Sequence, residues 1–461
     1  VAAAGGPKTV LIEYSSPNIA KPFHAGHLRS TIIGGYLARL HEAHGNTVHR
    51  VNYLGDWGKQ FGLLGVGYGK FGDEATLAAD PISHLFDVYV KTNSAAEEEG
   101  SSLHGDARRF FAGLESGGST ETALWRRFRD LSIASYDRMY RRLGVGFDEV
   151  AGESLYAEKA GAAVDAYAKH GAVAHEANGA LLADLTAADL GRVLLRKADG
   201  STLYITRDLA AAVDRHQRVA FDEMLYVAGS PQKLHFQQLF EMLRISGHAW
   251  ANKCRHVPFG SVAGMSTRQG NVVFLKDILD EARDRMAAII EANPAKVGGV
   301  DEVAAAAEAI GLAAVVVQDL KPRRIKGYSF DWDRILKPEG DTGPFLMYTH
   351  ARLDSIRRVS GVPIDSTCNL GLLTEPEATA VIASISKFEE TLNHSLHDLE
   401  PAIVVQYLID LARHSSRAVA ALRVKGSPDD VARARALLFD TARETLAGGL
   451  RLLGFTPLQR M

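Results

Sequence analysis

Short apolar runs alternate with helical stretches at the start of the chain. Residues 9–14 are apolar and β-branched, which predicts a buried strand, and residues 15–18 interrupt it with serine, proline and asparagine. Apolar side chains recur at helical spacing over residues 28–40, and Gly45 ends that pattern. Residues 47–53 have the pattern of a second strand. A strand, a helix and a strand in this order predict a parallel sheet, whose ligands bind at the carboxyl ends of the strands.

The pattern changes between residues 66 and 196. Residues 91–118 are rich in Glu, Ser and Gly, and the charge run Glu97-Glu-Glu99 within them predicts a solvated loop. Helical periodicity follows at residues 121–143, and residues 172–184 and 193–205 predict strands of a smaller sheet. We therefore expect an α+β domain inserted into the parallel-sheet fold.

The apolar pattern of the main sheet returns in the second half of the chain. Residues 224–228 and 256–260 predict strands, with a helix between them at residues 232–246. Residues 275–292 and 301–320 predict two further helices. This alternation favours a parallel sheet completed by residues far from its first strands.

Three structural units follow from this organisation. From Asp341 onward the pattern is almost entirely helical, apart from a loop at residues 360–368. A chain of 461 residues allows about three domains at roughly 150 residues each. The predicted fold class is α/β, with a Rossmann-like parallel-sheet catalytic domain at residues 1–65 and 197–335, an inserted α+β domain at residues 66–196, and an all-helical domain at residues 336–461.

Composition and charge narrow the functional classes only slightly. The formal net charge is −3, so nucleic-acid binding would require a local basic face. Two cysteines, Cys254 and Cys368, are too few for a disulfide framework or a four-cysteine zinc site. No run of 18 or more apolar residues is present, so we expect no membrane partner. We expect a cytoplasmic protein and leave a mitochondrial location open.

The segment His24-Ala25-Gly26-His27 carries the first chemical signal. It follows the first strand and opens a helix, whose free N–H groups and positive dipole end attract phosphate. Gly26 lets a ligand approach the backbone closely. Two histidines three residues apart share one helix face and can donate to phosphoryl oxygens. A pair of surface histidines is the alternative, and a zinc site is less favoured because no third ligand is near.

A polar loop at residues 264–271 is a candidate partner for this corner. It is small and flanked by glycines, and it carries one fixed cation, Arg268. A loop of this kind can close over a triphosphate and neutralise charge in the transition state. An ordinary surface turn is the alternative interpretation.

Longer strings resemble one known family. His24-Ala-Gly-His27 resembles the HIGH motif of class I aminoacyl-tRNA synthetases, and Met265-Ser-Thr-Arg268 resembles their KMSKS loop. Residues 13–30, 52–62, 341–352 and 452–457 resemble arginyl-tRNA synthetase of the fungal or animal cytoplasmic kind. The resemblance extends from about Val10 to Met461, in the order that the family shows. It implies a ligase that activates L-arginine with ATP and Mg²⁺ and transfers it to tRNA(Arg), with other synthetases or translation factors as candidate partners.

The resemblance also implies roles for individual residues. An arginine pocket would be formed by Glu13, Ser16, Pro17, Asn18, His27, Tyr204, Asp208 and Gln232. ATP would contact His24, Gly26, His27 and His235, together with Met265, Ser266, Thr267 and Arg268.

A pocket with these residue types suits a guanidinium. Its five fixed donors require carboxylates in a planar fork, which Glu13 and Asp208 could supply, while Tyr204 and Gln232 could orient the ligand. Taken from local sequence alone, Tyr204 would be a strand residue and Asp208 a helix cap. Gln232 and His235 would be first-turn capping residues.

The loop departs from the family pattern in its charge. Gly264 stands where relatives have the first lysine, and Gln269 stands where many have another. Lys21, three residues before His24, could reach the same phosphates. We therefore expect Lys21, His24, His27 and Arg268 to be the catalytic group, with a solvated surface lysine as the alternative role of Lys21.

The helical C-terminal region resembles the family's anticodon-binding domain. The expected tRNA contacts are Gly340, Asp341, Phe345, Tyr348, Arg352 and Tyr407, with the aromatic rings stacking on unpaired bases. Aromatic residues at helical spacing are more often core residues. Lys321, Arg323, Arg324 and Lys326 form a basic cluster that could contact backbone phosphates or simply face solvent.

Three other functions stay open at this point. The chain could be a class I synthetase for another amino acid, although the polar pocket residues argue against apolar substrates. It could be a small-molecule nucleotidylyltransferase, a class that does not need the long helical region. It could also be a synthetase-like RNA-binding or regulatory protein without charging activity, which the cation-poor loop favours.

Overall fold

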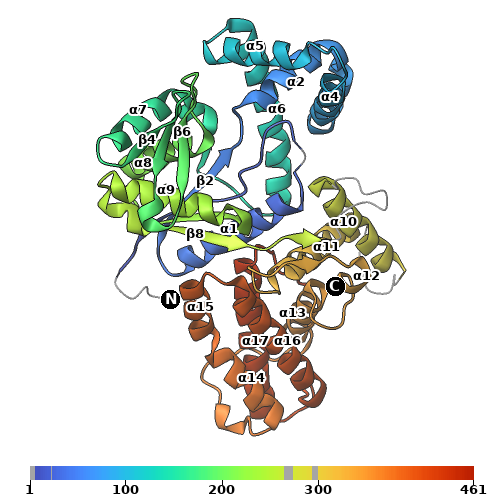
Figure 1. Cartoon of the computed structure of the whole chain (residues 1–461). Helices are drawn as coiled ribbons and strands as arrows, with labels where there is room; N and C mark the ends of the chain where they lie inside the picture. Colours follow the sequence, from blue (N-terminus) through green and yellow to red (C-terminus); the bar gives the residue numbers. More distant parts are fainter. Residues whose placement is uncertain (1–5, 22, 264–273, 293–299, 461) are drawn as a thin grey trace.

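A five-stranded, all-parallel sheet organises the molecule. The computed structural model describes residues 6–21, 23–263, 274–292 and 300–460. The strand order is β3-β2-β1-β7-β8, so the chain leaves the central strand first in one direction and later in the other (Figure 1). The strands are β1 (Thr9–Glu13), β2 (Thr47–Leu54), β3 (Glu149–Gly152), β7 (Glu223–Gly229) and β8 (Cys254–Phe259).

Both faces of the central strand are covered, which explains its continuous apolar run. Val10 and Ile12 belong to a core that includes α1 (Ala25–Ala43), whereas Leu11 belongs to the core formed by α8 (Tyr204–Val219) and α9 (Lys233–Ile245). Successive side chains of a strand point to opposite faces, so a strand buried on both sides needs no polar alternation. The strands predicted near residues 9–14, 47–53, 224–228 and 256–260 are confirmed as β1, β2, β7 and β8.

One strand of this sheet comes from the predicted insertion. β3 pairs with β2 in parallel, from Val51 opposite Glu149 to Leu54 opposite Gly152. The region predicted as an insertion therefore contributes one strand to the parallel sheet. The four residues of this strand are too few to show an alternation in sequence. The exact domain boundaries stay a prediction.

Helices dominate the rest of the insertion. The charge run at residues 97–99, expected to be a solvated loop, is exposed and lies between α4 and α5. The rest of residues 91–118, for which no helix was predicted, contains the end of α4 and all of α5, whose residues Leu103, Ala107 and Leu114 are buried. The many Ser, Gly and Glu residues obscured that spacing. Likewise, the strand expected at residues 193–205 ends at Arg196, and α8 begins at Tyr204. The elements are α2 (Lys59–Phe71), α3 (Glu74–Ala79), α4 (Pro81–Ala96), α5 (Leu103–Glu115), α6 (Ser119–Arg142), α7 (Ala157–Ala168), and an antiparallel sheet of β4 (Val173–His175), β5 (Leu181–Asp184) and β6 (Arg192–Arg196).

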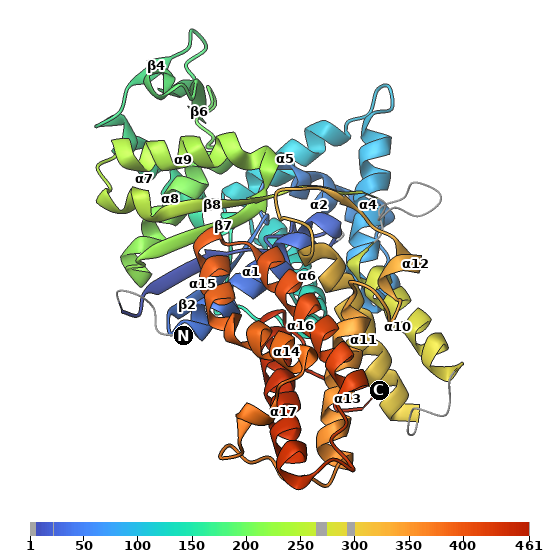
Figure 2. The same cartoon turned by 90° about the horizontal axis from the view of Figure 1, so that it is seen from below.

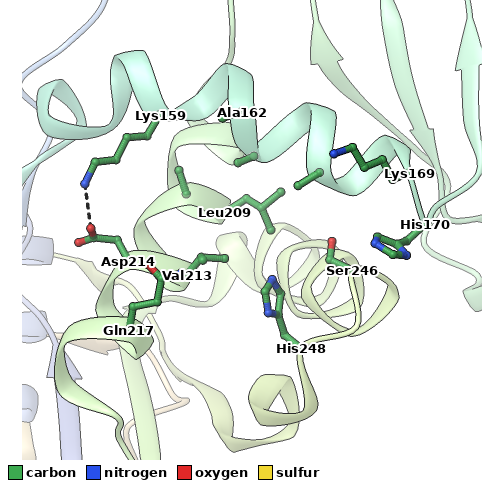
Figure 3. Close-up of a pocket in the computed structure, with 13 residues that line it drawn as sticks. Lys159, Ala162, Lys169, His170, Leu209, Val213, Asp214, Gln217, Ser246 and His248 are labelled. Atoms are coloured by element: carbon green, nitrogen blue, oxygen red, sulfur yellow. Dashed lines mark hydrogen bonds and ion pairs between the residues drawn. The ribbon is translucent and has the colours of Figure 1, made fainter.

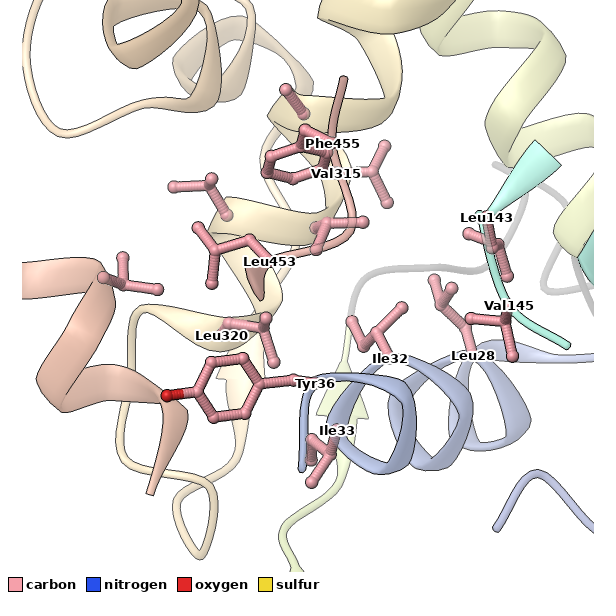
Figure 4. Packing of buried hydrophobic residues seen from close by; sticks show 14 of the residues in the cluster. Leu28, Ile32, Ile33, Tyr36, Leu143, Val145, Val315, Leu320, Leu453 and Phe455 are labelled. Carbon is pink, nitrogen blue, oxygen red and sulfur yellow. The ribbon is translucent and has the colours of Figure 1, made fainter. Parts of the chain in front are cut away.

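The C-terminal region is helical, as predicted, and packs against the parallel-sheet region through α1. Ile32, Ile33 and Tyr36 of α1 share one continuous core with Val315 and Leu320 and with Leu453 and Phe455, the last two from the C-terminal region (Figure 4). The C-terminal helices α14 and α17 lie at the end of the molecule opposite α4 and α5 (Figures 1 and 2). The remaining elements are β9 (Val262–Ala263), α10 (Leu275–Glu291), α11 (Val300–Leu320), β10 (Tyr328–Ser329), α12 (Trp332–Ile335), α13 (Gly343–Val359), α14 (Pro376–Ser386), α15 (Phe388–Asp398), α16 (Pro401–Ala421) and α17 (Asp429–Leu452).

Helix α11 is the most apolar helix of this region. By length and composition alone, residues 303–320 could cross a membrane, with a mean hydropathy of 1.7. Yet Ala307, Ile310 and Ala313 are fully buried within the protein core. Core packing therefore accounts for the apolar character of α11.

Candidate active site

A cavity of about 660 Å³ opens at the carboxyl ends of the neighbouring strands β1 and β7. This is the place where open parallel sheets bind ligands. It brings together most of the residues predicted for arginine and ATP, from Glu13 to His235. Its polar lining includes Glu13, Ser15, Ser16, Asn18, His24, His27, Ser30, Tyr53, Glu153, Tyr204, Asp208, Arg215, Tyr226, Gln232 and His235.

The backbone beside β1 is held in an unusual conformation. Ser15 and Ser16 have φ values of 71° and 47°, in the left-handed region that residues other than glycine rarely adopt. Their N–H groups donate to Oγ of Ser30 at 2.9 Å and to Oδ1 of Asn52 at 3.2 Å. Such strain persists where surrounding contacts enforce it, often at functional sites. Here it places Ser16 and Asn18 in the cavity wall.

His24 and His27 together form the N-terminal cap of α1. Nδ1 of His24 accepts a hydrogen bond from the N–H of Gly26 at 3.1 Å, and Nδ1 of His27 accepts from the N–H of His24 at 3.4 Å. The two rings stack, with centroids 3.8 Å apart. Because each Nδ1 accepts, the proton of each neutral ring sits on Nε2. The corner therefore carries two imidazole N–H donors on the cavity wall.

Burial keeps these rings neutral. It lowers the pKa of His27 to about 3, with further lowering from the nearby His24 and Lys21. Burial also lowers the pKa of His24. Gly26 leaves room for the His24 ring, because a Cβ there would lie 3.1 Å from Cε1 of His24. This corner suits hydrogen bonding to phosphoryl oxygens without fixed positive charge on the rings.

The carboxylate of Glu13 is already paired with an arginine of the protein. Glu13 forms an ion pair with Arg215, which is 1% exposed and whose Cζ lies 4.8 Å from the centre of the Tyr53 ring. Burial raises the pKa of Glu13, and Arg215 counteracts that effect. Glu13 lines the cavity as expected, and Arg215 offsets its negative charge there.

Asp208 and His235 form a second pair in the cavity wall, between a carboxylate and an imidazole. Oδ2 of Asp208 lies 2.8 Å from Nε2 of His235, and the ring of Tyr204 lies 5.0 Å from that of His235. Asp208 sits in the first turns of α8, four residues after Tyr204 and seven before Arg215. At 3.6 residues per turn, these three side chains share one face of the helix. Tyr204 is 56% exposed and so can contact a ligand.

Glu153 is a cavity residue that the sequence did not indicate. It directly follows β3 and lies 2.8 Å from Nη2 of Arg207. Burial raises the pKa of Glu153 to about 7; Arg207 opposes this rise and the nearby Asp208 adds to it. The position of Glu153 at the carboxyl end of a sheet strand was the available signal, but β3 was not predicted.

Several predicted residues lie elsewhere or outside the described part of the chain. Pro17 is buried and does not line the cavity; its carbonyl accepts from the N–H of Gly55 at 3.1 Å. Lys21 is also absent from the lining, and its Nζ lies 5.8 Å from the centre of the Tyr89 ring. Met265, Ser266, Thr267 and Arg268, like Gly264 and Gln269, fall outside the described residues.

Some of the predicted RNA contacts are exposed, whereas others contact side chains or backbone groups inside the protein. Tyr348 is 38% exposed and Arg352 is exposed one turn later on α13. By contrast, Phe345 packs against the core, and the Tyr407 ring stacks on Phe388. The Tyr407 hydroxyl donates to the carbonyl of Ser384 at 2.9 Å. We therefore withdraw Tyr407 as a base-stacking residue, because its ring and hydroxyl are used inside the protein.

The other C-terminal candidates also have protein partners. Asp341 pairs with Lys321 at 3.1 Å and with Arg413, and the neighbouring Gly340 has a φ of 83°. The guanidinium of Arg324 donates to carbonyl oxygens inside the protein, so it is not free to contact a phosphate with all its donors. Arg323 and Lys326 are exposed. The basic cluster is therefore smaller than its sequence indicates.

A second cavity of about 460 Å³ lies on the opposite side of α8 (Figure 3). Its floor is apolar and includes Leu209 and Val213, and Lys159 bonds to Asp214 at 2.8 Å beside it. Helix α8 therefore separates two cavities, with Asp208 and Arg215 on one side and Asp214 on the other. Among the described residues, no group of three or more His, Cys, Asp or Glu side chains is placed to hold a metal ion.

Two family models together match nearly the whole chain. The model for tRNA synthetases class I (R), catalytic domain, matches residues 1–332. The model for the DALR anticodon binding domain matches residues 346–461. The first match includes the cavity and the histidine corner, and the second includes α13 to α17.

Individual relatives agree with these matches. The cytoplasmic arginine–tRNA ligase of Saccharomyces cerevisiae is 46% identical, over 98% of this chain and 77% of the relative. The probable mitochondrial arginine–tRNA ligase of Mus musculus is also 46% identical, over 98% of this chain and 78% of the relative. The solved Thermus thermophilus arginyl-tRNA synthetase has the same fold, with a TM-score of 0.86 at 23% identity, over 100% of this chain and 84% of that one.

Proposed function

This chain belongs to the arginyl-tRNA synthetases of class I, and on that basis we propose that it activates L-arginine with ATP and transfers it to tRNA(Arg). One observation carries the proposal. A pocket containing Glu13, Glu153 and Asp208 adjoins a corner of two neutral histidines in a single cavity. The pocket suits a cationic side chain, and the corner suits phosphate.

Arginine recognition would depend mainly on Asp208, with Glu153 beside it. Arg215 offsets the charge of Glu13 and Arg207 offsets that of Glu153, whereas Asp208 pairs with the imidazole of His235. Carboxylates can accept the parallel N–H bonds of a planar guanidinium, a geometry that lysine lacks. Tyr204 would cover the ligand at the open side, and Ser16, Asn18 and Gln232 would bind its backbone groups. We keep His27 among the candidates because it also lines the cavity.

The histidine corner would act on the ATP phosphates. In the first step, an oxygen of the arginine carboxylate bonds to the α-phosphorus, and the bond to the β-phosphate oxygen breaks, releasing pyrophosphate. Nε2–H donors of His24 and His27 would stabilise charge on the phosphoryl oxygens without losing their protons. Mg²⁺ would enter with ATP as part of the substrate. Lys21, His235 and the residues Met265 to Arg268 complete the proposed ATP group.

The second step would join arginine to the RNA. The 2′-hydroxyl oxygen of the terminal adenosine bonds to the arginyl carbonyl carbon, AMP leaves, and the hydroxyl proton is lost to solvent or phosphate. Tyr348 and Arg352 are the exposed candidates for contacts with tRNA on the C-terminal helices. We propose a cytoplasmic location, although the similar proteins include both cytoplasmic and mitochondrial ligases.

ATP–pyrophosphate exchange with each of the amino acids, with and without tRNA, tests this function. Exchange that depends on arginine and is strongest with tRNA supports the proposal. Exchange with another amino acid identifies a different synthetase. Exchange with none, while RNA still binds, indicates an RNA-binding protein without charging activity.

A further inference from the structure

The guanidinium of Arg29 joins three segments inside the protein. Arg29 lies on α1 two residues after His27, and its side chain is fully buried. Its Nη1 donates to the carbonyl oxygens of Gly260 at 2.6 Å and Lys326 at 2.9 Å. The helix that begins with the histidine corner is therefore tied to the segment after β8 and to the segment before β10.

Asp319 on α11 supplies the negative charge beside Arg29. Its Oδ1 lies 3.4 Å from Nε of Arg29, and both side chains are 0% exposed. The hydroxyl of Tyr328 donates to Oδ2 of Asp319 at 2.8 Å. In a buried ion pair, attraction only partly offsets the lost hydration, and an apolar pair of similar volume is often as stable. Stability alone therefore does not explain a charged pair here, whereas a need for fixed geometry does.

Arg324 connects the same segments to the C-terminal helices. Its Nη1 donates to the carbonyl of Pro258 at 2.7 Å and its Nε to the carbonyl of Leu399 at 2.9 Å. Its backbone N–H donates to Glu400 at 3.1 Å, and its carbonyl accepts from the N–H of Gly260 at 2.8 Å. One residue thus bonds to the end of β8 and to the junction of α15 and α16.

These contacts form one continuous path. It runs from the α15–α16 junction through Arg324 to Gly260, and from Gly260 through Arg29 to α1. Gly260 allows the close approach in its middle, since a Cβ there would lie 2.6 Å from the N of Gly327. A second contact runs beside it, where the Tyr36 hydroxyl of α1 lies 2.6 Å from Oγ of Ser395 on α15. The path joins the region matched by the anticodon-binding model to the histidine corner.

We propose that Arg324 and Arg29 are positioning residues that carry the state of the C-terminal helices to the histidine corner. RNA held by these helices would move the α15–α16 junction. Through Arg324 and Gly260, that movement would change the backbone to which Arg29 fixes α1, and with it the placement of His24 and His27. The inference rests on the proposed function, and coupling of this kind is established only by measurement.

The first test is Arg324→Met, which removes the guanidinium donors and keeps an apolar stem. At saturating tRNA, we expect kcat for charging to fall by about tenfold or more, while Kd for tRNA changes by less than about threefold. Arg244→Met makes the same change on the surface of α9, 67% exposed, and should leave both values unchanged. Arg324→Lys serves as a second variant if Arg324→Met does not fold. It keeps the charge but loses the planar set of donors, so it should show the same loss of kcat.

Amide hydrogen exchange over residues 24–31 gives a readout besides activity. We expect bound tRNA to change exchange there in the unsubstituted protein and not in Arg324→Met. Tyr328→Phe removes the hydroxyl that holds Asp319 beside Arg29, so it should lower kcat by itself. Combined with Arg324→Met, it should reduce kcat no further than Arg324→Met alone, because Arg29 lies on the same path.

Three results would overturn the inference. One is an unchanged kcat in Arg324→Met, and another is a loss confined to Kd for tRNA, which would make Arg324 a binding residue. The third is a double variant in which the fold-loss of kcat equals the product of the losses in the two single variants. Charging by the unsubstituted protein, measured in the same series, reports on the proposed function separately.

Discussion

Glu13 and Arg215 form an ion pair in the wall of the active-site cavity, although 202 positions separate them in sequence. The pair sets the balance of charge there, because it cancels one of the carboxylates that line the cavity. Removing one member of a buried pair leaves the other charge without a partner, which costs more than removing both. The cavity wall is therefore expected to depend on the pair as a unit.

Arg215→Met should lower the free energy of unfolding by about 3 kcal/mol, because Glu13 remains buried without its partner. Glu13→Gln combined with Arg215→Met removes both charges and should recover part of that loss. Urea denaturation of the two variants measures the difference. A double variant no more stable than Arg215→Met would show that packing, and not the buried charge, dominates.

Asp208→Asn should weaken arginine binding by about 30-fold, because a hydrogen bond to a charged group contributes about 2 kcal/mol. The change keeps the shape of the side chain and also removes the charge beside His235. Calorimetric titration with arginine gives the Kd directly. Asp214→Asn is the matched control on the other side of α8 (Figure 3), and its Kd should stay within about twofold. Equal effects of the two variants would contradict the assignment of Asp208.

Arginine binding should strengthen as pH rises from 6 to 8. The pKa of Glu153 is raised to about 7, so below that pH the carboxyl group is neutral and attracts a guanidinium weakly. A group titrating at pH 7 gives up to about a tenfold change in Kd over this range. Glu153→Gln should remove this dependence. A wild-type Kd that does not vary between pH 6 and 8 would exclude Glu153 as a ligand contact.

The raised pKa of Glu153 also affects the stability of the ligand-free protein, which should fall as pH rises, whereas arginine binding should strengthen. Between the ordinary pKa of 4.5 and about 7, the folded protein holds a proton on Glu153 that the unfolded chain has lost. The contribution of Glu153 to stability is therefore present below pH 4.5 and is lost as pH rises to about 7. The free energy of unfolding, measured for the wild type and for Glu153→Gln across this pH range, isolates the contribution of Glu153.

Relatives have a lysine at the position of Gly264, and Lys21 is proposed to replace it. Lys21→Ala should then abolish ATP–pyrophosphate exchange while leaving arginine binding nearly intact. The structure places its ammonium beside Tyr89 and outside the cavity lining, so the lysine would have to turn toward the phosphates when ATP binds. Exchange kinetics and arginine titration on one protein preparation check this. Only a mild loss of exchange would remove Lys21 from the catalytic group.

Tyr348→Ala and Arg352→Ala should each raise Kd for tRNA by about tenfold, since base stacking contributes about 1–3 kcal/mol and both side chains are exposed on α13. Kd for arginine should not change. Tyr407→Leu is the contrasting variant, because the Tyr407 ring that it removes stacks on Phe388 inside the protein, and it should leave Kd for tRNA unchanged. A rise in Kd for tRNA with Tyr407→Leu, and none with Tyr348→Ala, would reverse the assignment.

The local part of the site could be predicted from the sequence. A strand, a helix and the histidines between them are consecutive in the chain, so their relation follows from periodicity and helix capping. The pairing of Glu13 with Arg215 and of Asp208 with His235 could not be predicted, because each depends on how distant segments meet. Glu153 was missed for a related reason: a four-residue strand shows no periodicity.

Composition hid one helix of the inserted region. Residues 91–118 are rich in Ser, Gly and Glu, yet α5 forms within them because Leu103, Ala107 and Leu114 are buried. Tertiary burial outweighed weak helix propensity there. Phe345 and Tyr407 show the same limit in the C-terminal helices, where sequence cannot separate a stacking ring from a core ring.

Charging of tRNA(Arg) with labelled arginine is the decisive measurement for this protein. We expect ATP-dependent incorporation of arginine into tRNA with an intact 3′ end, no incorporation of lysine, and a strong loss of incorporation in Asp208→Asn and in His24→Ala. Incorporation of another amino acid, or no incorporation by a folded protein that binds both arginine and tRNA, would contradict the proposed function.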